Sequence, residues 1–491
     1  MSKEFIINLL FLVGINLLIK PFYVFGIDLG VQNQLGPEAY GLYFVLFNFS
    51  FLFQIISDMG LQPFCNRFSA QHPKLVSKYL PQFLFFKLGL GFLFLLISLS
   101  TAYFLGYLSV EIWDLTFLLL LNQILLSMII FLRSFVSGSG FYRIDSLFSV
   151  LDKLLLIIFM SILLYTPFKV YLELRYFILS QSLSLLVTLI STLFFLGKTG
   201  ILVKLRAPQW AVLLLIIKKS GPYALAVLLM TVYSRLDAVM IEQILAGKEG
   251  KIQTGIYAFG YRLLDAFNII GYLFAGLLLP MYSKLLSEKK SCVELSSLAL
   301  RIMLISTIFL SFSIWFNAEN LCTWLLWHKD NQYASVLQLL IWTTVASGCI
   351  YVWGSLLTAA DLLKRMNQVF VLGLGVNIIS NLICIPLWGA WGAALSTLIT
   401  QSLVALGEFF ILIYSMQEQR KKLLSPIFLI RIFVFIFGTY FIIGASSTYL
   451  SSLIDWRISS ILGILFVFAW TEVIGLLRIS EILLLFKGKS Q

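Results

Sequence analysis

The sequence predicts an all-α integral membrane protein with about fourteen transmembrane helices, and two observations support this fold class. Hydrophobic residues make up 60% of the 491 residues and charged residues only 12%. Soluble domains contain about 45–50% apolar and about 25% charged residues. In addition, apolar windows of about 20 residues, the length that spans a bilayer as a helix, recur along the whole chain.

The apolar windows fall into two sets of six, followed by a final pair. The first set comprises Phe5–Leu29, Leu42–Ile56, Phe83–Phe104, Leu115–Val136, Leu147–Tyr165 and Tyr176–Leu196. The second comprises Tyr223–Leu245, Ile256–Tyr282, Leu295–Trp315, Val336–Thr358, Val369–Leu387 and Ala393–Tyr414, and the final pair is Ile427–Tyr449 and Ile458–Leu477. We therefore divide the chain into an N-lobe (1–197), a cytoplasmic amphipathic linker (198–221), a C-lobe (222–415) and two accessory helices (416–491).

Lysine and arginine predict the orientation, because these residues are retained in cytoplasmic loops. Most of the 35 lie on the side of the N-terminus, and the opposite loops hold only Lys169, Arg175, Lys248, Lys251, Lys329 and Arg457. We expect both termini in the cytoplasm. The net charge of +12 is then spread over one membrane face and does not indicate nucleic acid as a partner. The first span is too long for the apolar region of a signal peptide, so we expect no cleaved signal.

The five cysteines and two histidines are scattered. They have neither the spacing of a disulfide framework nor that of a metal site. We expect no metal and no cofactor.

Similar segments follow the first and the seventh span. In both, a polar outward loop precedes Gly-x-Tyr (Gly41–Tyr43 and Gly255–Tyr257), and an apolar helix then runs to a proline, Pro63 or Pro280. Six helices separate the copies, so the two halves have the same orientation and are related by a pseudo-twofold axis along the membrane normal. Between the halves, Trp210–Ile217 suits an interfacial helix. The alternative is that this segment is a short re-entrant piece or a tail piece of the next span.

Several basic residues fall within the predicted spans. Lys87, Arg301 and Arg431 lie near cytoplasmic helix starts, where we expect their side chains to snorkel to the headgroups. Lys153, which follows Asp152 in the sequence, lies at an intermediate depth. The remaining three, Lys20, Arg235 and Arg262, lie deeper, and buried ionisable groups of this kind face a bundle interior or an aqueous cavity.

Helix geometry orients the charges of the seventh and eighth spans. Arg235 and Glu242 are seven residues apart, so they share a face about 10.5 Å apart along the axis. Asp237 is rotated by about 200° from Arg235 and cannot share that face. Arg262 and Asp265 lie one turn apart and can pair directly.

Basic groups in a cavity suit an anionic ligand, because guanidinium matches phosphate oxygens bidentately. We therefore predict a substrate-binding set with Arg235 as the leading phosphate contact. The carboxylates of the spans either bind a proton or sodium ion, or balance the basic charges. The substrate-binding set is Arg235, Arg262, Lys20 and Lys153, and the carboxylates are Asp28, Asp237, Glu242 and Asp265.

Several motifs together resemble a known family. They are GPEAYGLY with DMGL behind it, LDAVMIEQIL followed by TGIYAFGYRL and LLLPMYSK, and ICIPLWGAWGAALSTLITQ. In this order they resemble the polysaccharide transporters of the multidrug/oligosaccharidyl-lipid/polysaccharide (MOP) exporter superfamily. The resemblance covers essentially the whole chain and implies two six-helix lobes around a cavity that opens alternately to each side. In the related lipid II flippases, an extra helix pair lines a groove for the lipid tail. We assign Gly389 and Gly392 of the last motif to a tight turn and close helix contact.

The resemblance implies a flippase in the bacterial inner membrane. Its substrate would be an undecaprenyl-diphosphate type oligosaccharide, moved to the outer leaflet for O-antigen, capsule or exopolysaccharide synthesis. Membrane lipids, the polysaccharide polymerase and the chain-length machinery are the expected partners. The alternative within the superfamily is a multidrug or cation exporter. A membrane glycosyltransferase or polymerase is disfavoured because the longest outward loop carries only Glu319, His328, Lys329 and Asp330, so we expect no enzyme.

Overall fold

The computed structural model describes residues 14–16, 18–62, 65, 68–69, 75–201, 210–327, 330–416, 420–421 and 425–476, with the side chains of 168, 210–220 and 222–223 left out. Within these residues the regular structure is entirely helical, as the sequence predicts. Packing divides the chain into two units, Met1–Ala258 and Phe259–Gln491. The predicted lobe boundaries, with the span Tyr223–Leu245 assigned to the C-lobe, remain a prediction based on the repeat.

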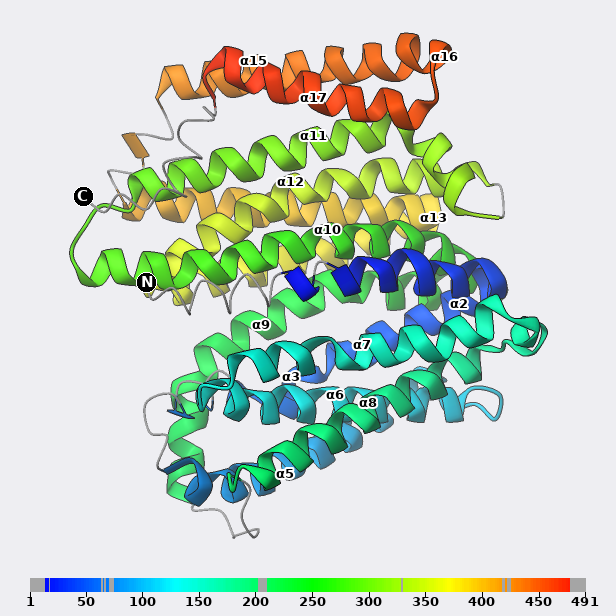
Figure 1. The fold of residues 1–491 in the computed structure, drawn as a ribbon, viewed down its shortest axis with the longest axis vertical. Helices are drawn as coiled ribbons and strands as arrows, with labels where there is room; N and C mark the ends of the chain where they lie inside the picture. Colours follow the sequence, from blue (N-terminus) through cyan, green and yellow to red (C-terminus); the bar gives the residue numbers. More distant parts are fainter. Residues whose placement is uncertain are drawn as a thin grey trace. The chain divides into compact units, whose positions relative to one another are not determined.

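The first unit is built around long apolar helices (Figure 1). Helix α6 packs against α8, α8 against α7, α3 against α5, and α2 against α9. Aromatic side chains fill the core between α5 and α6, where Phe83, Phe131 and Phe135 are almost completely buried. The elements are η1 (Tyr23–Asp28), α2 (Leu29–Leu52), α3 (Gln54–Asp58), α5 (Val76–Phe104), α6 (Trp113–Gly138), α7 (Tyr142–Tyr165), η3 (Pro167–Tyr171), α8 (Leu174–Lys198), α9 (Trp210–Leu245) and the start of α10 (Gly247–Ser287).

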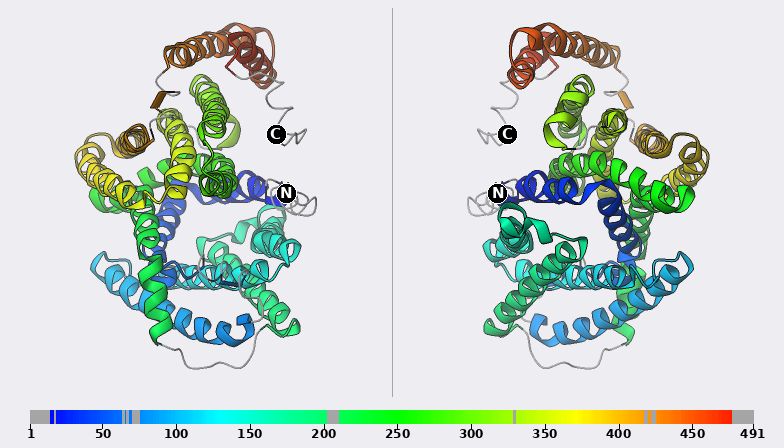
Figure 2. Two further views of the ribbon diagram at one scale, coloured as in Figure 1. Left: turned by 90° about the vertical axis from the view of Figure 1, so that its left-hand side faces the viewer. Right: turned by 90° about the vertical axis from the view of Figure 1, so that its right-hand side faces the viewer.

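The second unit contains the rest of α10 and the C-terminal helices. Helix α12 packs against both α11 and α13, and the accessory pair α15 and α17 stacks on α11 in both views of Figure 2. A separate apolar core joins this pair to α11. The elements are α11 (Val293–Leu325), α12 (Asn331–Ala359), α13 (Leu363–Ser415), α15 (Pro426–Ala445), η4 (Ser446–Leu450), α16 (Ser451–Leu453) and α17 (Trp456–Ile474).

Twelve helices of the described chain are long and apolar enough to cross a membrane, so fourteen separate helices are not confirmed. Two long helices each cover two predicted spans: Gly14–Leu52 covers the first pair and Leu363–Ser415 covers the eleventh and twelfth. Each bends at a glycine with a positive φ, Gly36 (φ 79°) and Gly389 (φ 56°). Only glycine adopts such angles without strain. The predicted loops are therefore kinks, because helical bonding resumes immediately on either side.

The two copies of the Gly-x-Tyr motif contact each other within the first unit. A Cβ atom at Gly41 would lie 1.9 Å from the Lys251 carbonyl oxygen, and one at Gly255 would lie 2.1 Å from the Pro37 oxygen. Each glycine thus packs on the backbone four residues before the other. This reciprocal pattern is what a twofold relation between the copies requires.

The predicted linker is only partly described. Residues 202–209 lie outside the described chain, and Trp210–Ile217 forms the first turns of α9 rather than a separate helix. The alternative of a piece attached to the next span agrees with this continuity. A position at the membrane interface remains a prediction.

Candidate functional site

A polar cluster surrounds the π-helix η1 in the first unit. Asp28, at the end of η1, is 1% exposed. Its carboxylate accepts a hydrogen bond of 2.7 Å from the Tyr40 hydroxyl and one of 3.4 Å from the Tyr23 hydroxyl. π-Turns are rare and often occur at functional sites. Here the wider turn places Asp28 and Tyr23 on the same polar cluster.

Two predicted lysines belong to the same cluster. The Lys153 ammonium lies 4.8 Å from the centroid of the Tyr23 ring and 3.4 Å from the Asp152 carboxylate. Lys20 lies close enough to Asp152 and Lys153 to interact electrostatically with both. The structure therefore brings together Lys20 and Asp28 of the helix Gly14–Leu52 and Lys153 of α7.

Arg235 lies half-buried on α9 and faces α2. Its Nη1 atom is 3.5 Å from the Asn48 side-chain oxygen, and its guanidinium carbon is 5.5 Å from the centroid of the Phe51 ring. These contacts place the guanidinium group against an amide and an aromatic ring of α2. Sequence reasoning missed Asn48, a polar residue within a predicted span.

The two carboxylates of α9 point to different neighbours, as the predicted rotation requires. Asp237 is 1% exposed and accepts a 3.0 Å hydrogen bond from the Tyr257 hydroxyl. Glu242 accepts bonds of 2.9 Å from Tyr107 and from Gln243. Burial, and then Glu242, raise the pKa of the Tyr107 phenol far above its usual range, so Tyr107 stays protonated as a donor. Glu242 is therefore held by the neutral side chains of Tyr107 and Gln243.

Arg262 and Asp265 lie one turn apart on α10, and both are half-buried. This placement agrees with the spacing that the sequence predicts. They belong to the second unit, whereas the other predicted site residues belong to the first.

The prediction that Lys87 snorkels is wrong. Lys87 is 2% exposed, and its ammonium lies 3.0 Å from the Asp58 carboxylate and 2.7 Å from the Ser127 hydroxyl. Asp58 ends α3, which packs against α5. The sequence did not reveal that Asp58, at the end of this short helix, is the counterion of Lys87.

Snorkelling of Arg301 and Arg431 remains a prediction, and the structure shows which protein groups they contact. Each donates a 3.0 Å hydrogen bond to a backbone carbonyl after α17, Arg301 to Leu476 and Arg431 to Gly475. The carbonyl end of a helix carries partial negative charge and attracts cations. Arg301 thus connects the end of α17 to α11, and Arg431 connects it to α15.

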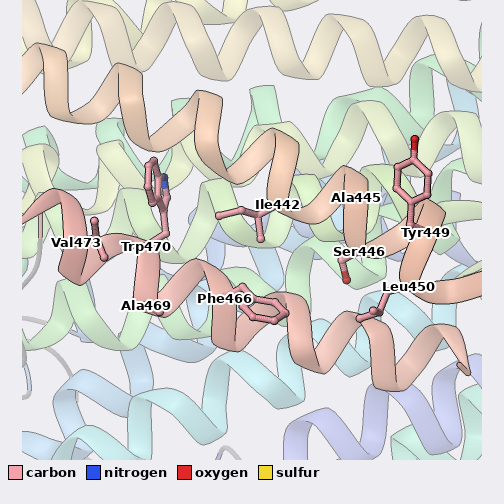
Figure 3. A pocket seen from close by; sticks show the side chains of 9 residues that line it. All are labelled: Ile442, Ala445, Ser446, Tyr449, Leu450, Phe466, Ala469, Trp470 and Val473. Atoms are coloured by element: carbon pink, nitrogen blue, oxygen red, sulfur yellow. The ribbon is translucent and has the colours of Figure 1, made fainter. Parts of the chain in front are cut away.

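An apolar pocket of about 530 Å³ lies between α15, η4 and α17. Figure 3 labels its nine lining side chains, which include Ile442 from α15 and Phe466 and Trp470 from α17. Ser446 of η4, which also lines the pocket, donates a 2.6 Å hydrogen bond from its hydroxyl to the Ser459 carbonyl of α17 and so joins η4 to α17. The volume lies within the range of small-ligand sites, and the lining suits a hydrocarbon chain.

Comparisons with known proteins agree with this architecture. A family model described as "Polysaccharide biosynthesis protein" matches residues 8–286, more than half of the chain. The search of curated proteins gives no match.

Several solved structures share the fold. The lipid II flippase MurJ in an inward closed conformation aligns with a TM-score of 0.64 at 17% identity, covering 94% of this chain and 98% of that one. An inward-facing multidrug resistance MATE family transporter of the MOP superfamily aligns with a TM-score of 0.64 at 15% identity, covering 81% and 95%. A MOP superfamily transporter from Pyrococcus furiosus gives 0.58 at 15% identity, covering 84% and 95%. At these identities the likeness establishes the fold.

Proposed function

This chain belongs to the polysaccharide biosynthesis protein family, and on that premise we propose that it is an alternating-access flippase. Its substrate is a lipid-linked oligosaccharide repeat unit of the undecaprenyl-diphosphate type. The protein moves this substrate from the cytoplasmic to the outer leaflet of the bacterial inner membrane, where O-antigen, capsule or exopolysaccharide is assembled. The fold shared with a lipid II flippase supports the proposal.

The observation that carries the proposal is the environment of Arg235. Its guanidinium lies inside an apolar span that is long enough to cross a membrane, where it contacts Asn48 and Phe51 of α2. A membrane protein keeps such a charge where it faces a cavity or a ligand. A diphosphate offers oxygens that match the guanidinium fork. Lys20 and Lys153 add positive charge in the same unit, and Arg262 adds it on α10.

The pocket of the accessory pair supports a lipid-linked substrate. A prenyl chain needs an apolar surface, and the aromatic and aliphatic side chains between α15 and α17 provide one. We propose that this pocket holds part of the lipid tail while the headgroup is bound elsewhere.

The driving force and the partners belong to the same proposal. A proton or sodium gradient drives the cycle, with Asp28, Asp237, Glu242 and Asp265 as candidate carboxylates; the alternative role for them is charge balance. Both termini lie in the cytoplasm. The polymerase and the chain-length machinery receive the product. Labelling of an engineered C-terminal cysteine from outside the cell would contradict the orientation.

The test of function is flipping of a lipid-linked oligosaccharide in proteoliposomes containing Arg235 variants. We expect Arg235→Lys to keep the charge but lose much of the rate, since lysine lacks the guanidinium fork. Arg235→Ala removes a charge-assisted contact worth about 1.5–3 kcal/mol, a loss of affinity of about 10- to 150-fold. Because Tyr107 and Gln243 hold Glu242, Arg235→Ala should still fold.

Arg175→Ala is the matched control. Arg175 is exposed and pairs with Asp114 at the start of α6. This variant should flip the substrate normally. Normal flipping by well-folded Arg235→Ala would refute the role of Arg235, and export of cationic drugs without glycolipid flipping would favour the multidrug exporter.

A further inference from the structure

Glu408 is a buried carboxyl group that the proposed site does not use. It lies on the second half of α13 and is 0% exposed. It is seven residues (415 − 408) from the end of the helix, or about 10 Å at 1.5 Å per residue. In the described part of the chain, neither of its carboxyl oxygens accepts a hydrogen bond. No described basic side chain forms an ion pair with it.

The space for this carboxyl group comes from a glycine on the facing helix. A Cβ atom at Gly354 of α12 would lie 3.1 Å from one Glu408 oxygen and 3.4 Å from the other. Next to this glycine, Trp353 packs its ring 5.4 Å from Phe409, the residue that follows Glu408. The Trp353 Nε1 atom is also buried without a hydrogen-bond partner among the described residues. In this conformation the Trp353 N–H donor of α12 and the Glu408 carboxyl oxygens of α13 thus both lack hydrogen-bond partners among the described residues.

We propose that Glu408 is a proton-binding site of the second unit, neutral in this conformation and ionised when α12 and α13 rearrange. An ionised carboxylate buried without a partner costs far more free energy than the neutral acid. The packing of α12 against α13 therefore favours the protonated form of Glu408. A movement that brings water or the Trp353 N–H to Glu408 favours release of the proton. As a site that couples protons to transport, Glu408 rests on the proposed function, but its protonation state does not.

The surroundings contain few groups that compete for the proton. On α12 the titratable neighbour is the Cys349 thiol, which interacts electrostatically with Glu408. The charged residues at and just before the start of α13 are Asp361, Lys364 and Arg365, and all three are exposed. Arg365 donates a 2.7 Å hydrogen bond to Ser415.

Infrared spectroscopy of the purified protein without substrate tests the protonation state. A neutral carboxylic acid has a carbonyl stretch separate from the amide bands, and this measurement does not depend on reagent access. We expect such a band at neutral pH in the unaltered protein and its loss in Glu408→Gln. The control Glu319→Gln, at an exposed position of α11, should keep it. Identical spectra for the unaltered protein and Glu408→Gln would overturn the proposal.

Conformational measurements test the link between proton and packing. A spin-label pair on α12 and α13 should change its distance distribution as the pH rises in the unaltered protein. Glu408→Gln, fixed in a neutral form, should show no change. If Glu408→Gln keeps the full pH response, Glu408 is not the responsible site. Neither experiment contains a glycolipid, so failure of the flippase proposal would leave both results interpretable.

Discussion

Tyrosine hydroxyls hold three of the carboxylates predicted for ion coupling. Asp28 accepts from Tyr40, Asp237 from Tyr257, and Glu242 from Tyr107. A hydroxyl stabilises a carboxylate without adding a positive charge. The sequence identified the carboxylates, because acids are rare within apolar spans. It did not identify Tyr107 as the partner of Glu242, because 135 residues separate the two.

Sequence reasoning also missed the role of Glu408 and the ion pair between Lys87 and Asp58. Glu408 is the sole acid in its predicted span, a signal that was available in the sequence. Lys87 was visible as well, but its counterion Asp58 lies just beyond a predicted span end. Sequence spacing shows that a charge lies within or near a span, whereas only the packing of the helices shows whether it is buried and what it faces.

The Lys87–Asp58 pair should contribute to the stability of the first unit. Replacing Lys87 with Met leaves the Asp58 carboxylate without its ammonium partner. Breaking a fully buried pair costs about 3–5 kcal/mol, and Asp58 is 22% exposed, so we expect the lower end of that range or less. The double variant Lys87→Met/Asp58→Asn should regain most of the loss.

A thiol-reactive dye measures this effect, because all five cysteines are buried in the folded protein. The midpoint of thermal unfolding should fall in Lys87→Met and recover in the double variant. An unchanged midpoint in the single variant would assign the pair no structural role.

Among the helices, α2 and the start of α10 approach each other closely at the two glycines of the repeat. The sequence singled out Gly41 and Gly255 as equivalent positions in two halves. It did not show that the two glycines meet. A repeat pattern indicates which positions are related, and the contact depends on the angle at which the helices cross.

Alanine at Gly41 should separate these two helices. The added Cβ would overlap the Lys251 carbonyl oxygen, and backbone atoms cannot move aside as a flexible side chain does. We expect a cost of about 1–3 kcal/mol for the overpacking. Gly89→Ala on α5 is the matched control, because nothing lies within 4 Å of its added Cβ.

Cross-linking reports the separation. Glu38 and Lys248 form a 3.5 Å ion pair beside the crossing, so cysteines at these positions should react with a short bifunctional thiol reagent. The cross-link should be lost with Gly41→Ala and kept with Gly89→Ala. Cross-linking at the original yield in Gly41→Ala would contradict the close approach.

The pocket of the accessory pair offers a second test among the helices. Ala469 lines the pocket, so Ala469→Trp should fill much of its volume and reduce glycolipid flipping. Leu465→Trp, at a 61% exposed position of the same helix, adds an indole without entering the pocket. We expect flipping to fall only in Ala469→Trp. Equal rates in both variants, at equal thermal stability, would exclude the pocket as a lipid-tail site.

For the whole molecule, periodicity and composition predicted the fold class and the position of nearly every described helix. They did so because a bilayer requires about 20 apolar residues per helix and leaves little choice of structure. The number of separate helices was not predictable, since Gly36 and Gly389 allow helical bonding to continue through what reads as a loop. The substrate-binding role of the predicted basic residues remains a prediction, because it depends on how the cavity changes during transport.

The accessory helices should be dispensable for insertion but not for flipping, and removal of residues 423–491 tests this. Deletion exposes Ile308 and Phe312 of α11, which pack against Phe435 and Ile443 of α15. Lipid chains can replace these contacts, since lipid is as apolar as the lost side chains. Arg301 loses its Leu476 carbonyl but can reach the headgroups.

We therefore expect the truncated protein to insert into membranes, unfold at a lower temperature than the full chain, and lose glycolipid flipping. A control that lacks only residues 477–491 keeps α15, α17 and the pocket between them, and it should retain activity. Fractionation and thermal unfolding in detergent measure insertion and stability, and the proteoliposome assay measures flipping. A truncated protein that fails to insert would make the pair part of the folding core. A truncated protein that flips the glycolipid at the full rate would show that the pocket has no part in transport. The lipid tail of the substrate would then need no protein surface beyond the first twelve predicted spans.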